Sequence, residues 1–196
     1  MQFVLGVDEA GRGPLAGPVS VGVVMVAKGF DVAAEFPGVA DSKQLSEKKR
    51  EAIFVLLEAR VAKGDARYVV EWGSEGDIDA HGIAVVVREA VARGVNRLAE
   101  ISDEGQTFII MLDGALRAPI EYRQQTIIGG DASVPLISLA SIAAKVVRDR
   151  LMCRQALLYP GYGFEEHKGY GTKAHYAALA LHGPCFIHRR TFIHLD

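Results

Sequence analysis

Two apolar runs near the start of the chain, separated by a segment rich in glycine and proline, constrain the fold most strongly. Residues 3–7 (FVLGV) and 19–26 (VSVGVVMV) are short and rich in valine, so both predict sheet strands. Residues 9–18 (EAGRGPLAGP) contain too much glycine and proline for the interior of a helix or a strand. We therefore expect a structured loop between two strands, the first of which stops at Asp8 and Glu9.

Helices and strands mix along the rest of the chain. Ser46 followed by Glu47 predicts the start of a helix, which apolar residues at helical spacing extend to Val61. Further strands are expected at 67–72, at 107–112 and near 125–128, and further helices around 83–91, at about 138–158 and from Thr172 to residue 182, with Gly183 as its C-terminal stop. This order predicts an α/β domain on a mixed sheet, with a helical C-terminal region beginning near residue 160.

Size and composition exclude several classes of protein. A chain of 196 residues buries a core without a disulfide framework, and Cys153 and Cys185 alone predict reduced thiols in a cytoplasmic protein. The start of the chain predicts neither a signal peptide nor a membrane span, because acids interrupt its short apolar run and no basic residues precede it. The net charge of −2 by itself argues against a nucleic-acid partner, yet residues 145–196 carry 8 basic and 4 acidic residues.

Acidic residues stand at the ends of three apolar runs. Asp8 and Glu9 follow the first, Asp113 follows another, and Asp131 comes just after residues 127–130 (IIGG). Open α/β sheets place ligand sites at strand ends, and carboxylates gathered there repel one another unless a hard cation lies among them. Mg²⁺ and Mn²⁺ prefer oxygen ligands, so the pattern fits a two-metal phosphoryl-transfer site, in which one ion activates water and the other stabilises the leaving oxygen. Each acid taken singly would be an ordinary turn residue.

Three further segments carry groups that suit a phosphate or a sugar. The backbone of a glycine-rich loop approaches a ligand closely, and its N–H groups can bind an anion or a hydroxyl. The segment before the Ser46 helix has ordinary turn chemistry but could also contact phosphate, and the segment before the Thr172 helix combines a cation with an aromatic ring that can stack on a sugar or a base. The residues concerned are Gly11, Arg12, Gly13, Ser42, Lys43, Lys168 and Tyr170.

Other site types lack their motifs. The sequence contains no Walker loop, no dinucleotide-binding fingerprint and no G-x-S-x-G nucleophile motif. Cys185 and His188 lack the second pair of ligands that a zinc site of this kind needs.

Taken in order, these segments resemble ribonuclease HII, the type 2 ribonuclease H of bacteria. The resemblance covers nearly the whole chain and rests on residues 8–17 (DEAGRGPLAG), 41–46 (DSKQLS), 113–114 (DG), 130–131 (GD), 143–149 (AAKVVRD), 162–164 (YGF), 167–170 (HKGY), 182–183 (HG) and 188–192 (HRRTF). Gly129 departs from the pattern, because many relatives have a larger, often basic residue there.

The resemblance implies a ribonuclease-H-like fold with a five-stranded mixed sheet flanked by helices. It implies a catalytic domain over residues 1–160 and a C-terminal helical substrate-binding cap over residues 161–196. The implied activity is cleavage of RNA in RNA–DNA hybrids and incision 5′ to single ribonucleotides in duplex DNA, which leaves 3′-hydroxyl and 5′-phosphate ends.

The resemblance also implies roles for particular residues. Asp8, Glu9, Asp113 and Asp131 would be the catalytic ligands of Mg²⁺ or Mn²⁺. Residues 11–13 would sense the ribose 2′-hydroxyl, and Tyr170 would stack on the sugar that follows the ribonucleotide. We interpret Asp149 as an ion-pair residue of the long helix instead of a fifth ligand.

Two alternatives stay open at the level of sequence. One is another metal-dependent nuclease or phosphotransferase on a related fold, for which the loop and Tyr170 would be coincidental. The other is a non-catalytic module that binds nucleic acid through its basic C-terminal part. Whichever function holds, the ribonuclease included, we expect a monomer in the cytoplasm.

Overall fold

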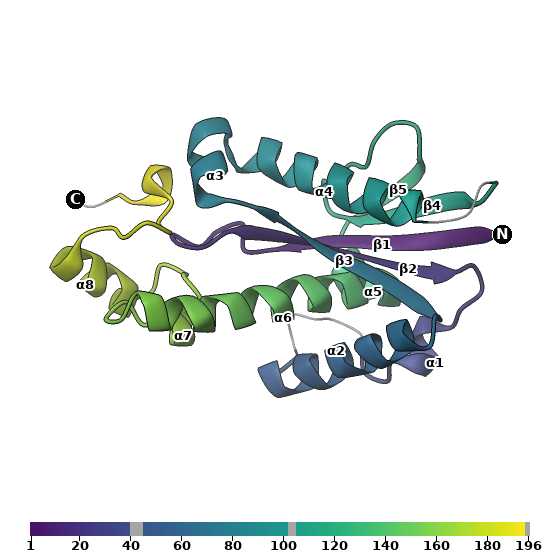
Figure 1. Cartoon of the computed structure of the whole chain (residues 1–196), viewed down its shortest axis with the longest axis horizontal. Coiled ribbons are helices and arrows are strands. Elements are labelled where there is room, and N and C mark those ends of the chain that lie inside the picture. The colour runs from purple at the N-terminus through teal and green to yellow at the C-terminus, as the bar shows by residue number, and fades with distance from the viewer. Residues whose placement is uncertain (40–44, 102–104, 195–196) are drawn as a thin grey trace.

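A five-stranded mixed sheet forms the centre of the computed structural model, which describes residues 1–39, 45–101 and 105–194. The strand order is β3-β2-β1-β4-β5 (Figure 1). β1 and β3 each pair antiparallel with β2, whereas β4 pairs parallel with both β1 and β5. The strands are β1 (Gln2–Ala10), β2 (Val19–Ala27), β3 (Ala66–Gly73), β4 (Thr107–Asp113) and β5 (Arg123–Ile127). The mixed sheet that the sequence predicts is therefore confirmed.

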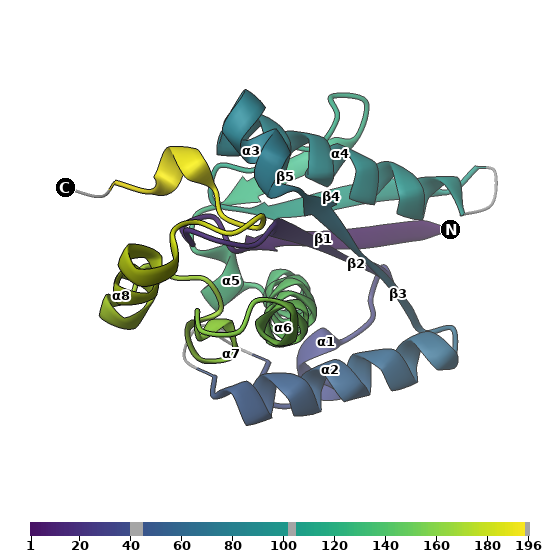
Figure 2. The ribbon, with the colours of Figure 1, turned by 60° about the vertical axis from the view of Figure 1, so that its left-hand side comes forward.

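Helices cover both faces of this sheet (Figure 2). The long helix α6 (Pro135–Leu158) lies on one face with α2 (Glu47–Ala62) and α1 (Val32–Glu35). On the other face lies α4 (Ile83–Glu100), preceded by α3 (Glu75–His81). Val23 belongs to the core on the α4 side and Val24 to the core on the α6 side. Burial on both faces explains why the β2 segment is apolar except for Ser20 instead of alternating with polar residues.

Helix α6 crosses the sheet at very short range. A Cβ at Gly22 of β2 would lie 2.2 Å from the carbonyl oxygen of Ala140, so only glycine fits there. Ser20 on the same strand donates a hydrogen bond of 3.1 Å to the carbonyl of Ala144. The small residues of α6 thus bring the helix, and the side chains of Ser141 and Lys145, close to the end of β1.

Helix ends follow the sequence where a capping residue marks them. The Ser46 side chain accepts a hydrogen bond from the backbone N–H of Lys49 at the start of α2. Thr172 does the same for His175 at the start of α8 (Lys173–His182), and that helix ends at Gly183, whose φ is +70°. Both N-caps and the glycine stop were expected.

Several boundaries differ from the sequence prediction. Strand β5 begins two residues earlier and ends one residue earlier than the expected 125–128, and α6 begins at Pro135 instead of near residue 138, because proline is well suited to the first turn of a helix. The short helices α1, α3, α5 (Gly130–Ser133) and α7 (Phe164–His167) were not predicted. Helices of four to seven residues are too short to show a hydrophobic period.

The C-terminal region forms a third apolar core with parts of the first 160 residues. Phe164 and Leu179 of this region pack in one cluster with Leu15 of the loop after β1 and with Met152 of α6. The chain then passes through a 3₁₀ turn, η1 (Arg190–Phe192). The division at residue 160 stays a prediction. Across the described residues, no helix combines the length and the apolar character that a membrane crossing requires.

Candidate active site

The parallel pairing of β1 with β4 places two of the predicted acids side by side. Val7 is the register partner of Leu112, so Asp8 and Asp113 come next on neighbouring strands. Asp113 in turn is the partner of Ile127, the last residue of β5. The ends of three adjacent strands therefore converge on one edge of the sheet, as the sequence pattern suggested.

Asp131 reaches the same place by a different route from the expected one. It lies in the helical turn α5 and not directly at a strand end, because Gly129 takes a left-handed conformation with φ of +66° and starts a helical turn after β5. The backbone N–H of Asp131 then donates to Oδ1 of Asp113 at 3.3 Å. The turn folds Asp131 back toward the acids of β1 and β4.

Asp8, Asp113 and Asp131 form a compact carboxylate cluster. One oxygen from each lies within 4.8 Å of the others. Burial and, after it, the charges of Glu9 and Asp113 together raise the pKa of Asp8 to about 8, although a hydrogen bond from Ser141 acts in the opposite direction. Packed carboxylates that resist ionisation in this way are the donor set that a hard divalent cation stabilises. The residues present therefore fit a divalent metal.

Glu9 lies beside this cluster but is not part of it. Side chains alternate along a strand, so Glu9 leaves β1 on the face opposite Asp8. Its Oε1 pairs with Arg12 at 3.3 Å. Its Oε2 is buried and accepts no hydrogen bond from any residue that the structure describes. An orphaned carboxylate oxygen at this position is a further available oxygen ligand.

A cavity of about 390 Å³ opens over these acids. Cationic side chains line it together with the acids: Arg12 from the loop, Arg50 from α2 and Lys145 from α6. Sequence reasoning did not select Arg50, Ser141 or Lys145 as site residues. The segment AAKVVRD of the resemblance contains Lys145, but its spacing to Asp149 pointed only to an ion pair. The cavity is lined by Asp8, Glu9, Ala10, Gly11, Arg12, Gly13, Arg50, Asp113, Ser141, Lys145 and Tyr170.

The glycine-rich loop lines the cavity with all three of its predicted residues, 11–13. Gly11 has a φ of +87°, and a Cβ on it would lie 2.1 Å from Nε of Arg148. No other residue fits at this position without displacing that guanidinium.

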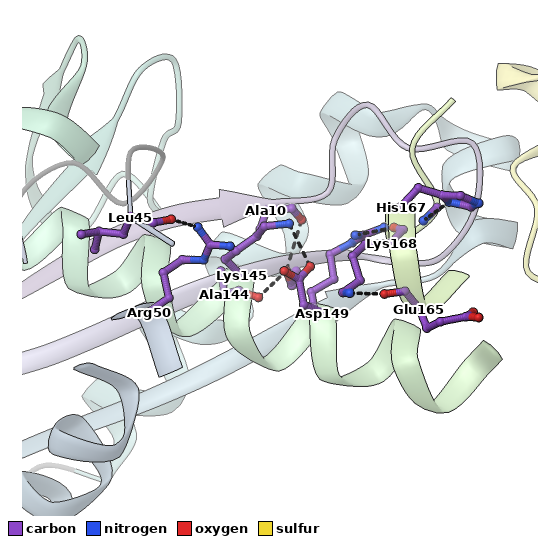
Figure 3. Close-up of polar contacts among 12 residues, drawn as sticks. Ala10, Leu45, Arg50, Ala144, Lys145, Asp149, Glu165, His167 and Lys168 are labelled. Carbon is purple, nitrogen blue, oxygen red and sulfur yellow. Dashed lines mark hydrogen bonds and ion pairs between the residues drawn. The ribbon is translucent and has the colours of Figure 1, made fainter. Parts of the chain in front are cut away.

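Tyr170 and Lys168 have different environments despite their proximity in sequence. The Tyr170 ring is 41% exposed, lines the cavity and lies 5.5 Å from the Lys145 ammonium. Lys168 is buried, and its ammonium donates to the carbonyl of Glu165 instead of reaching the cavity (Figure 3). The structure thus brings Tyr170, but not the Lys168 side chain, to the acids.

Asp149 pairs with Lys145 at 2.9 Å, as its spacing on α6 predicts (Figure 3). Arg150 pairs with Glu51 of α2 instead. The predicted contacts of Ser42 and Lys43 lie outside the described residues. Cys185 Sγ lies 3.1 Å from Nδ1 of His188 as a hydrogen-bond partner, and both cysteines are free thiols.

The sequence profile of the family described as Ribonuclease HII matches residues 5–195. The chain belongs to this family. A ribonuclease HII of Geobacter metallireducens is 46% identical over 190 residues, which cover 96% of this chain and 83% of the relative. A ribonuclease HII of Endomicrobium trichonymphae is 44% identical over 190 residues, covering 96% of this chain and 84% of the relative.

Solved ribonuclease HII structures share the fold. The ribonuclease H2 of Pyrococcus horikoshii is 28% identical with a TM-score of 0.74, over 96% of this chain and 93% of that one. The ribonuclease HII of Archaeoglobus fulgidus, solved in a complex with PCNA, is 25% identical with a TM-score of 0.76, over 98% and 96% of the two chains. The expected ribonuclease-H-like fold is confirmed. As a ribonuclease HII, the protein is a metal-dependent hydrolase with ribonuclease H activity on RNA–DNA hybrids.

Proposed function

We propose that this ribonuclease HII incises duplex DNA 5′ to single embedded ribonucleotides as well as cleaving hybrids, and that two divalent ions held at the carboxylate cluster support the reaction. The observation that carries the proposal is that Asp8, Glu9 and Asp113 line one cavity together with the glycine-rich loop and Tyr170, while Asp131 belongs to the same carboxylate cluster. The same cavity thus holds groups that suit phosphodiester hydrolysis and groups that suit a ribose.

In this proposal Asp8, Asp113 and Asp131 hold the metal, and Glu9 offers its unpaired oxygen as a further ligand. When bound, Mg²⁺ or Mn²⁺ supplies the activation of water and the stabilisation of the leaving 3′-oxygen. Lys145 and Arg50 line the same cavity, and their charges would attract the scissile phosphate and its neighbours.

The loop and Tyr170 account for the choice of substrate. Backbone N–H groups of residues 11–13 at the cavity wall suit a hydrogen bond to a 2′-hydroxyl, the group by which a protein distinguishes RNA from DNA. The exposed face of Tyr170 suits stacking on the next sugar. The region after residue 160 supplies Tyr170, so we infer that it acts as a substrate-binding cap on the catalytic domain.

The decisive experiment incubates the protein with duplex DNA that carries a single ribonucleotide, in Mg²⁺, in Mn²⁺ and in chelator. We expect one cut 5′ to the ribonucleotide, with 3′-hydroxyl and 5′-phosphate ends, only when metal is present. Cleavage in chelator would contradict the metal mechanism, and intact strands alongside cleaved hybrid would contradict the proposed substrate.

Two site variants test the assignment of the carboxylates. Asp8→Asn and Asp131→Asn remove ligands that stabilise the transition state by several kcal/mol, so turnover should fall at least about a thousandfold while hybrid binding persists. Asp65→Asn, an exposed acid that pairs with Arg60, is the matched control and should retain full turnover. Full activity in either ligand variant would refute the assignment.

A further inference from the structure

Arg189 is completely buried and holds the loop by its backbone. Its Nε donates to the carbonyl of Gly17 at 2.9 Å, Nη1 to that of Arg12 at 2.9 Å, and Nη2 to that of Gly11 at 2.7 Å. All three contacts span more than 170 residues of sequence. A residue near the end of the chain therefore holds three carbonyls of a loop near its beginning.

Arg148 of α6 is also completely buried and joins the loop to the segment that carries the tyrosine. Its Nε donates to the carbonyl of Pro18 at 2.9 Å and its Nη2 to that of Ala16 at 3.1 Å. Its Nη1 donates to the carbonyl of Lys168 at 2.9 Å, two residues before Tyr170. One guanidinium thus links the loop that contains residues 11–13 to the segment that carries Tyr170, although the two come from opposite ends of the sequence.

The hydrogen bonds of the two guanidinium groups go to backbone carbonyls, and although the charge of Glu75 acts on both, neither forms a salt bridge among the described residues, which makes burying the two charges costly. Arginine keeps its charge and holds its donors in one rigid plane, so each side chain imposes a geometry on three carbonyls at once. Two buried positive charges close to each other destabilise a fold. Their rigid sets of donors, however, are well suited to holding a loop in one shape.

The orientation of the peptide planes shows what this shape achieves. In a trans peptide the carbonyl of one residue and the N–H of the next point in opposite directions. Because the carbonyls of Gly11 and Arg12 point at Arg189, the N–H groups of Arg12 and Gly13 point away from it. Within the described residues these two N–H groups donate to no other group, and both residues line the cavity.

We propose that Arg148 and Arg189 are positioning residues for ribonucleotide recognition: Arg189 orients the N–H groups of Arg12 and Gly13 toward the cavity, and Arg148 sets the distance between this loop and Tyr170. This inference rests on the proposed function. It concerns substrate choice, because the hydrogen bonds of both guanidinium groups go to backbone carbonyls of the loop and of Lys168 and not to the metal-binding carboxylates.

The test compares kcat and KM for a single-ribonucleotide duplex and for a continuous RNA–DNA hybrid. Arg148→Lys and Arg189→Lys keep the charge but lose the planar fork, and Arg148→Gln removes the buried charge, so that it remains informative if a lysine variant does not fold. We expect kcat/KM on the single-ribonucleotide duplex to fall about 10- to 100-fold relative to the hybrid, because small misplacements have such effects. The affinity for Mn²⁺, measured by calorimetry, should be unchanged in these variants.

Exposed neighbours provide matched controls. Arg150→Lys on α6 and Arg190→Lys next to Arg189 make the same chemical change at exposed positions, and both should retain the wild-type preference. Because Arg148 is proposed to act through Tyr170, Tyr170→Ala alone should reduce kcat/KM on the single-ribonucleotide duplex relative to the hybrid. Adding Arg148→Lys to Tyr170→Ala should reduce this ratio little further.

The outcomes separate this inference from the proposed function. A wild-type protein that cuts no single-ribonucleotide duplex would refute the proposed function. A wild-type preference that survives in all three arginine variants would refute the positioning role alone. An equal loss of kcat/KM on both substrates, or a loss of Mn²⁺ binding, would also refute the positioning role. Either result would show that the arginines stabilise the fold as a whole.

Discussion

Asp8 occupies a position that favours function at the expense of stability. It is buried beside two other carboxylates, and burial first, then the charge of Glu9, raises the pKa of its carboxyl to about 8. In the unfolded chain this carboxyl is ionised at neutral pH. Folding without metal must therefore either protonate Asp8 or bury an unfavourable charge, and the metal-free protein is destabilised by that amount.

We predict that Asp8→Asn stabilises the metal-free protein while it abolishes turnover. Removing the ionisable group should raise the free energy of unfolding at neutral pH by on the order of 2 kcal/mol, because a one-unit pKa difference corresponds to about 1.4 kcal/mol. Urea unfolding in chelator measures this.

Asp149→Asn should change the free energy of unfolding in the opposite direction. It removes the partner of Lys145 from a largely buried ion pair, so the free energy of unfolding should fall. If Asp8→Asn were also destabilising, the strain that we ascribe to the carboxylate cluster would be refuted.

At the scale of elements, a chain of histidines holds the C-terminal region together. The N–H of Cys185 donates to Nδ1 of His188, so Nε2 of His188 carries the proton and donates to Nε2 of His175 at 3.0 Å. Nδ1 of His175 then donates to the carbonyl of Tyr170 at 2.9 Å. The bond from Cys185 requires a neutral His188, and the bond between the two histidines requires a neutral His175.

We predict that this region makes the protein sensitive to acid. Burial lowers the pKa of both imidazoles, and for His188 burial, followed by the neighbouring His175 and the charges of Arg190 and His167, lowers it to about 4. Between the ordinary histidine pKa of about 6.5 and pH 4 the unfolded chain therefore binds more protons, and stability falls as pH falls, by roughly 3 kcal/mol for His188.

Urea unfolding at about pH 7.5 and about pH 5 measures this effect. His188→Gln should reduce the difference in unfolding free energy between the two values. His81→Gln, at an exposed position on α3, should leave the difference unchanged. Equal pH dependence in wild type and His188→Gln would show that the acid sensitivity arises elsewhere.

At the scale of the whole molecule, metal binding and folding are linked through the sheet. The three carboxylates of the cluster come from β1, β4 and the turn after β5, and they meet only when the parallel strands pair. An ion that binds them therefore binds the folded state and stabilises it.

We predict that Mn²⁺ at about 100 times its dissociation constant adds about 2.7 kcal/mol, which corresponds to a rise in Tm of about 5–10 °C for a domain of this size. Calorimetric scans with and without the ion measure the rise. Asp131→Asn should reduce the rise strongly, whereas Asp65→Asn should not. A rise that persists unchanged in Asp131→Asn would show that the ion binds at another site.

Features that depend on neighbouring residues in the sequence could be predicted from it. The valine-rich strands, the capping roles of Ser46 and Thr172 and the Lys145–Asp149 pair follow from spacing alone, and the structure contains all of them. The acids were found because each follows an apolar run. The helical turn that carries Asp131 was not, since a four-residue helix has no period to detect.

The sequence by itself determined which elements form and which residue types are available for a metal and a sugar, because periodicity, capping and side-chain chemistry are local properties. Only the tertiary structure decided that Glu9 lies beside the carboxylate cluster, that the Lys168 ammonium turns away from the cavity, and that Lys145 faces it. The contacts of Arg148 and Arg189 with backbone carbonyls of the loop are likewise visible only in the tertiary structure. Every residue offers a carbonyl, so a contact between an arginine and a carbonyl far along the chain leaves no pattern in the sequence.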